Sequence, residues 1–184
     1  REAHAAGQLA FGENYIQEGV DKIASLADLP LEWHCIGPIQ SNKSKLVAEN
    51  FAWVHSIDRL KIAERLSAQR PAHLPPLQIC LQVNVDGGNN KSGVTPSELL
   101  ELAQAVAKLP HLQLRGLMTI PEPAANELAA RAVHRQAKEL FDSLNAAGLK
   151  LDTLSMGMTV DLEAAIAEGS TCLRVGTAIF GARQ

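Results

Sequence analysis

The feature that most constrains the fold is the alternation of strand-like and helix-like segments along the whole chain. Short apolar segments with strand character begin near residues 9, 32, 53, 77, 112, 151 and 171, and an amphipathic segment follows each of them except the last. Repeats of this kind build parallel sheets whose connections run over the outside. Seven units exceed the roughly five or six of an open doubly wound sheet. The alternation therefore favours a TIM-like (β/α)8 barrel over that alternative.

A barrel of this kind closes with eight strands, and seven are visible in the sequence. The chain opens on a helix-like segment, residues 1–8, in which Gly7 is placed to end the helix. We therefore expect the first strand to be missing from this sequence and to lie upstream of residue 1. The expected organisation is a single barrel domain over residues 1–184, incomplete at its N-terminus.

Composition narrows the class of protein. A chain of 184 residues that is 46% hydrophobic suits one soluble globular domain. Its net charge of -3, without a basic run, argues against a nucleic-acid surface, and no apolar run approaches the roughly 20 residues that cross a bilayer. The histidines lack metal-ligand spacing, so we expect no metal. Three dispersed cysteines indicate reduced thiols and a cytoplasmic protein: Cys35, Cys80 and Cys172.

Two glycine turns near the C-terminus are candidates for a phosphate site. Gly157 and Gly176 each follow a strand-like segment, and a missing Cβ would let backbone N–H groups approach an anion. Three hydroxyl side chains lie beside these turns: Ser155, Thr159 and Thr177. A barrel can hold a phosphate at its last two βα loops. Such turns also serve only to reverse the chain, so their spacing leaves both interpretations open.

Arg174 is expected to point into the barrel. Period-two alternation puts it on the same strand face as Cys172 and Gly176, opposite Leu173 and Val175. A buried guanidinium needs an acceptor, so this position indicates a polar interior or a ligand.

Six segments together resemble the YggS/PROSC family, the pyridoxal 5'-phosphate (PLP) homeostasis proteins. They run in order over nearly the whole chain: FGENYIQE (11–18), EWHCIGPIQSNK (32–43), VNVDGGNNKSG (83–93), RGLMTIP (115–121), SMGMTVD (155–161) and RVGTAIFGAR (174–183). The resemblance implies a TIM-like barrel, related to the N-terminal domain of alanine racemase, that carries PLP as a Schiff base. The family's Schiff-base lysine lies in the first strand, which we expect upstream of residue 1.

The resemblance also assigns residues to the cofactor. It implies that Thr159, where the family usually has serine, grips the phosphate with Gly176 and Thr177, and that Arg174 lies beside the pyridine nitrogen. The remaining expected cofactor-binding residues are Asn14, Ser155, Gly157, His34, Asn84 and Met118. A core histidine satisfied by the backbone is an equal alternative for His34, and plain packing is the favoured alternative for Met118.

One loop departs from the family pattern. Gly88 stands where the family's VNxxxExxKxG pattern has a glutamate, which puts in doubt any role of that glutamate in ordering the loop. Lys91 in the same loop and Lys43 are either solvated charges or attract the anionic ligand.

The leading functional hypothesis is a non-enzymatic PLP carrier, a cytoplasmic monomer that buffers the cofactor or delivers it to PLP-dependent apoenzymes. An arginine at the ring nitrogen keeps its own proton and leaves the ring a poor electron sink. The alternative is a PLP-dependent racemase or decarboxylase, although such enzymes use a tyrosine from a second domain and the only tyrosine here is Tyr15. A third possibility, a sugar-phosphate barrel enzyme, needs a catalytic Lys or Glu, for which Glu13 is the obvious candidate.

Overall fold

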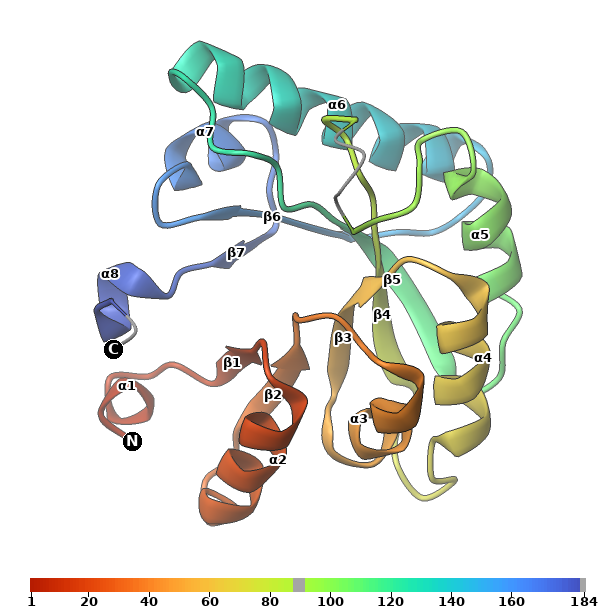
Figure 1. The fold of residues 1–184 in the computed structure, drawn as a ribbon, viewed down its shortest axis with the longest axis vertical. Coiled ribbons are helices and arrows are strands. Elements are labelled where there is room, and N and C mark those ends of the chain that lie inside the picture. The colour runs from red at the N-terminus through yellow and green to blue at the C-terminus, as the bar shows by residue number, and fades with distance from the viewer. Residues whose placement is uncertain (88–91, 183–184) are drawn as a thin grey trace.

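The computed structural model describes residues 1–87 and 92–182 and shows one curved parallel sheet with helices on its outer face (Figure 1). All six neighbouring strand pairs are parallel. The strands are β1 Ala10–Glu13, β2 Glu32–Cys35, β3 Trp53–Ile57, β4 Leu77–Gln82, β5 Leu112–Met118, β6 Thr153–Met158 and β7 Cys172–Arg174. Their starts confirm the strand positions expected from the sequence to within two residues.

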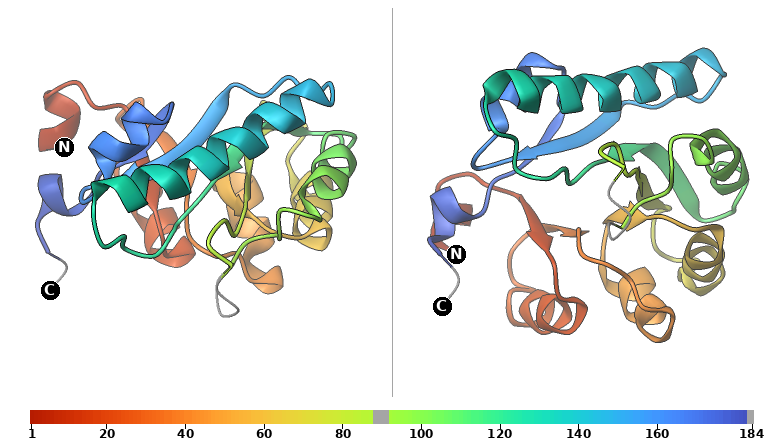
Figure 2. Two further views of the ribbon diagram at one scale, coloured as in Figure 1. Left: turned by 90° about the horizontal axis from the view of Figure 1, so that it is seen from above. Right: turned by 45° about the horizontal axis from the view of Figure 1, so that its top comes forward.

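The order of the strands distinguishes a barrel from a doubly wound sheet. They follow one another as β1-β2-β3-β4-β5-β6-β7, with no reversal of direction across the sheet. The sheet curls until its two edge strands, β1 and β7, approach each other, and the first and last helices lie side by side there (Figure 2). This is a nearly closed seven-stranded barrel, and it confirms the predicted fold class.

The helices cover the outer face of the sheet, except the first and the last helix, which bury no residue and lie by its two edge strands. In chain order the helices are α1 Glu2–Ala5, α2 Ile16–Ser25, α3 Ser44–Asn50 after the 3-10 turn η1 Ser41–Lys43, α4 Leu60–Gln69, α5 Leu99–Val106, α6 Glu127–Ala146, α7 Leu162–Ala167 and α8 Thr177–Phe180. Helix α8 corrects the expectation that no helix follows the last strand. Within 1–87 and 92–182, no helix has the length and apolar character needed to span a membrane.

Strand β4 shows that the two faces of the sheet have different surroundings. Its outward-facing Leu77, Ile79 and Leu81 are fully buried in the apolar core between the sheet and the helices. Residues of the opposite parity face the barrel axis, where Gln78 and Gln82 keep polar side chains. The apolar core thus lies outside the sheet, and the barrel axis is left for polar groups.

Strand β5 passes close to β6 at Gly116, which pairs in register with Thr153. A Cβ on Gly116 would overlap the Thr153 carbonyl group, so only glycine fits without moving a strand.

We predict that Gly116→Ala lowers the free energy of unfolding by about 1 to 3 kcal/mol or more, as overpacking of a closed interior does. Urea unfolding followed by circular dichroism measures the change. Gly176→Ala is the control, because Gly176 has a negative φ and open space in its Cβ direction. Equal stability of the two variants would contradict the close approach of β5 and β6.

Candidate functional site

The last two βα turns lie next to each other at the carboxyl ends of β6 and β7. The Ala178 amide in α8 donates a hydrogen bond to Thr159 Oγ1 in the β6–α7 turn, over 3.4 Å. Gly176 and Thr177 are exposed, and among the described residues no atom outside the adjoining chain lies within 4 Å of the Cβ position of Gly176. The structure therefore brings Thr159, Gly176 and Thr177 together, and their binding of a phosphate stays a prediction.

Gly157 has a packing reason of its own. It adopts a φ of 93°, which favours glycine, and it is buried. A Cβ there would lie 2.5 Å from the Cβ of Ala165 in α7 and 2.9 Å from Leu173 Cδ2 in β7. The missing Cβ therefore allows α7 to pack on the sheet, and a part for Gly157 in anion binding stays a prediction.

Arg174 points into the barrel, as the alternation predicted. Its Nη1 donates to Ser155 Oγ over 2.7 Å, and its Nη2 donates to the Thr119 carbonyl oxygen over 2.7 Å. Both acceptors are uncharged, and burial lowers the pKa of the guanidinium. Two of the five N–H donors are used in these bonds, so the arginine retains donors for a ligand.

Ser155 belongs with Arg174 rather than with the glycine turns. It is fully buried on β6, and its Oγ lies 2.8 Å from His55 Nδ1 as well as 2.7 Å from Arg174 Nη1. The sequence had grouped it with Thr159 and Thr177 as a hydroxyl beside the turns. A bulge between Ser155 and Met158 separates the interior part of β6 from its turn, which explains the difference.

His34 lies toward the amino ends of the strands. Its ring stacks on Trp53, with centroids 5.2 Å apart, and its Nδ1 lies 2.8 Å from His55 Nε2. Together with Trp53 and His55 it lines a cavity of about 270 Å³ that also reaches Thr153 and Cys172, the first residues of β6 and β7. His34 is therefore joined to Arg174 through His55 and Ser155, and direct contact with a cofactor stays a prediction.

The other predicted residues occupy different levels of the barrel. Asn14 is exposed after β1, and its carbonyl packs closely against Gly37. Asn84 follows β4, and its Oδ1 accepts a hydrogen bond from the Gly87 amide. Met118 is fully buried and pairs in register with Gln82 and Ser155, so it faces the barrel axis. Cofactor contact by Asn14, Asn84 and Met118 remains a prediction; Gly88 and Lys91 lie outside the described residues.

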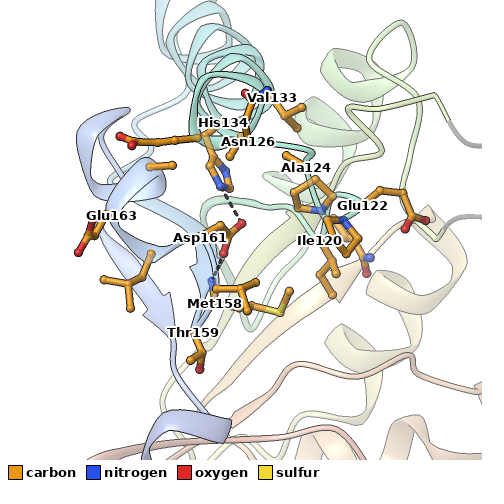
Figure 3. Close-up of a pocket in the computed structure, with 18 of the residues that line it drawn as sticks. Ile120, Glu122, Ala124, Asn126, Val133, His134, Met158, Thr159, Asp161 and Glu163 are labelled. Carbon is orange, nitrogen blue, oxygen red and sulfur yellow. Dashed lines mark hydrogen bonds and ion pairs between the residues drawn. The ribbon is translucent and has the colours of Figure 1, made fainter.

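A cavity of about 1040 Å³ opens between the loops that follow β5 and β6 and the start of α6 (Figure 3). Its lining mixes apolar side chains such as Val133 with polar ones such as Glu122 and Asn126. Of the residues predicted from the sequence, only Thr159 lines it. The cavity therefore extends from the candidate phosphate turn toward the outer helices.

Sequence reasoning missed two residues that hold this turn. His134 Nε2 lies 2.9 Å from Asp161 Oδ2, and Asp161 Oδ1 accepts a hydrogen bond from the Met158 amide over 2.7 Å (Figure 3). His134 is fully buried on α6. An aspartate just before a helix start was the available signal, because it is a common N-cap.

A family model described as "Alanine racemase, N-terminal domain" matches residues 1–184. The chain belongs to this family. Within the alanine racemase N-terminal domain family, the chain is 64% identical over 184 residues to a pyridoxal phosphate homeostasis protein of Pseudomonas aeruginosa, covering 100% of this chain and 79% of that protein. It is 58% identical over 186 residues to the protein of the same name from Escherichia coli, of which it covers 80%.

Solved structures of other proteins superpose on this barrel. PipY of Synechococcus elongatus with PLP bound superposes with a TM-score of 0.90 at 41% identity, covering 98% of this chain and 85% of PipY. An alanine racemase of Clostridium difficile gives a TM-score of 0.77 at 15% identity, over 98% of this chain and 47% of the racemase, which shows a shared fold. The predicted family is therefore confirmed.

The buried histidine beside Ser155 makes a testable contribution to stability. Burial, followed by repulsion from His34 and Arg174, lowers the pKa of His55 to about 3. Because the folded-state pKa lies below the unfolded value of about 6.5, the neutral form is favoured by folding. This stabilisation is fully present above about pH 6.5 and is lost as the pH falls toward 3.

We predict that His55→Gln, which keeps a donor and an acceptor but cannot titrate, loses less stability than the wild type between pH 6.5 and 4.5. The expected difference in slope is about 1 kcal/mol per pH unit. Urea unfolding at a series of pH values measures it. Parallel profiles for the two proteins would show that His55 is not held neutral by the fold.

Proposed function

We propose that this chain holds PLP at the carboxyl ends of its strands without catalysing a reaction of it, as a protein of PLP homeostasis. Support comes from the names of relatives at 64% and 58% identity and from PipY, whose structure contains bound PLP. The proposal extends to a cytoplasmic monomer that passes the cofactor to PLP-dependent apoenzymes.

The donors present fit the two polar ends of this cofactor. A phosphate takes hydroxyl and backbone N–H donors, which Thr159, Gly176 and Thr177 supply on adjoining turns. A pyridine nitrogen takes an N–H donor, which Arg174 retains on the inner face of β7. We assign the phosphate to the first group and the ring nitrogen to Arg174.

The observation that carries the non-enzymatic part is the surroundings of Arg174. When bound, PLP supplies an aldehyde that combines with amines and a ring whose power to withdraw electrons depends on protonation of its nitrogen. Both hydrogen-bond acceptors of Arg174 are neutral, and a guanidinium stays protonated even where burial lowers its pKa. Arg174 therefore donates a hydrogen bond and cannot leave a proton on a ring nitrogen.

We predict that Thr159→Val weakens PLP binding about tenfold or more, because it removes a hydroxyl donor to an anion worth about 1.5 to 3 kcal/mol at nearly constant volume. Fluorescence titration of the intact protein with PLP measures the dissociation constant. Thr95→Val is the matched control, since Thr95 is exposed in the turn before α5, outside the candidate site. An unchanged dissociation constant for Thr159→Val would remove Thr159 from the site.

We also predict that the intact, PLP-loaded protein exchanges no α-hydrogen of common amino acids in deuterated water. Mass spectrometry of the amino acids detects exchange before complete turnover. A folded, loaded Arg174→Glu variant is the informative comparison, because a carboxylate can stabilise a protonated ring nitrogen. Steady racemisation or decarboxylation by the wild type would replace the carrier function with the racemase-like alternative.

A further inference from the structure

Four consecutive contacts link a surface carboxylate to Arg174 through the interior of the barrel. Glu32 Oε1 lies 2.9 Å from His34 Nε2, and His34 Nδ1 lies 2.8 Å from His55 Nε2. His55 Nδ1 lies 2.8 Å from Ser155 Oγ, which in turn lies 2.7 Å from Arg174 Nη1. We call these five residues the histidine relay. It joins β2, β3, β6 and β7, which are far apart along the chain.

The chemistry of the two ends fixes the direction of every hydrogen bond between them. An ionised carboxylate only accepts hydrogen bonds, so His34 Nε2 must carry the proton that faces Glu32. A guanidinium only donates, so Ser155 Oγ must accept from Arg174. The half-exposed side chain of Glu32 keeps its contact with water, whereas Arg174 is part-buried and burial lowers the pKa of its guanidinium.

Because both histidines are neutral, the hydrogen bonds in the middle of the relay take the same direction. Burial lowers the pKa of both His34 and His55, and the positive charge of Arg174 lowers that of His55 further, so both rings are neutral at pH 7. A neutral ring has one N–H group and one acceptor. With its proton on Nε2, His34 accepts at Nδ1 from His55 Nε2, and His55 accepts at Nδ1 from the Ser155 hydroxyl.

We propose that the histidine relay runs in one direction, from Arg174 through Ser155, His55 and His34 to Glu32, and that it positions Arg174 for its ligand. Both histidines are then the Nε2–H tautomer. The direction of the relay stands on the contacts and on the neutral form of both rings, whereas the positioning of Arg174 for a ligand rests on the proposed function.

Positioning follows from how Arg174 is held at both of its terminal nitrogens. Ser155 donates its hydroxyl hydrogen bond to His55, so a lone pair of its oxygen is directed to Arg174 Nη1. The Thr119 carbonyl oxygen accepts a hydrogen bond from Nη2. Two bonds to a planar group fix its plane as well as its place. With the opposite direction, His55 and Arg174 would both donate to Ser155, and its own proton would be left to the Cys172 thiol, a weak acceptor. Ser155, His55 and His34 are therefore positioning residues.

The direction is tested on the wild-type protein without PLP. Nitrogen-15 NMR of its histidine side chains at pH 7.5 distinguishes a protonated from an unprotonated ring nitrogen. We expect His34 and His55 both to carry their proton on Nε2. A proton on Nδ1 of either ring, or on both nitrogens of one ring, overturns the proposed direction.

The same spectra test whether Glu32 sets the direction. In Glu32→Ala, water replaces the carboxylate at His34 Nε2, and water can donate or accept. We expect the Nδ1–H tautomer to appear at His34 and also at His55, although residue 32 does not touch the second ring. Unchanged tautomers at both rings would show that the carboxylate does not direct the relay.

The positioning role is tested by PLP titration of three variants and one control. Ser155→Ala should raise the PLP dissociation constant about two- to tenfold, as for the loss of one hydrogen bond. Ser67→Ala is the matched control, because this buried serine donates to the Pro110 carbonyl away from the barrel axis. His55→Gln keeps a donor and an acceptor and should bind PLP as the wild type does, whereas His55→Leu should resemble Ser155→Ala.

The outcomes separate this inference from the proposed function. If the wild type fails to bind PLP, the proposed function fails and the positioning role with it, while the NMR result still decides the direction. If the wild type binds and Ser155→Ala binds equally well, the positioning role is wrong. If His55→Gln is as impaired as His55→Leu, a polar link at this position does not support Arg174, and the positioning role is again wrong.

Discussion

The hydrogen bond from Arg174 to Ser155 is the contact on which the polar interior of this barrel depends. A guanidinium buried among apolar side chains would carry a desolvation penalty of several kcal/mol without partners. Ser155 and the Thr119 carbonyl accept hydrogen bonds from the guanidinium. Two histidines continue the hydrogen-bonded chain from Ser155 to a carboxylate that is in contact with water. The interior can therefore contain one positive group without a buried counter-charge beside it. The apolar core remains outside the sheet, where the helices supply the burial that stabilises the fold.

The sequence was sufficient to predict the barrel because apolar and polar residues alternate along its strands. Leu77, Ile79 and Leu81 specify which face of β4 meets the helices, and the same period of two predicts that Arg174 points toward the axis. The start of α6 is also readable, since Asn126 has the side chain of an N-cap and accepts a hydrogen bond from the Ala129 amide.

The site was less readable, for reasons that are local. Period-two alternation holds along a regular strand, but the irregular pairing after Ser155 separates this residue from the glycine turn that lies beside it in the sequence. His34 and His55 are 21 positions apart, and only the pairing of β2 with β3 brings their rings together. His134 and Asp161 are likewise separated in sequence by a helix and a strand. Contacts of this kind depend on how strands are staggered, which composition and periodicity do not specify.

The bond between His134 and Asp161 has a consequence for the speed of ligand exchange. Asp161 contacts the middle of α6 with one oxygen and the Met158 amide with the other, so the turn that carries Thr159 is already ordered before an anion arrives. Little conformational entropy is then lost on association, and arrival is governed by diffusion and by charge. The lifetime of a complex at such a turn is set by the contacts broken on departure. On the proposed function, a change in the contacts of this turn would alter the residence time of the phosphate more than its rate of capture.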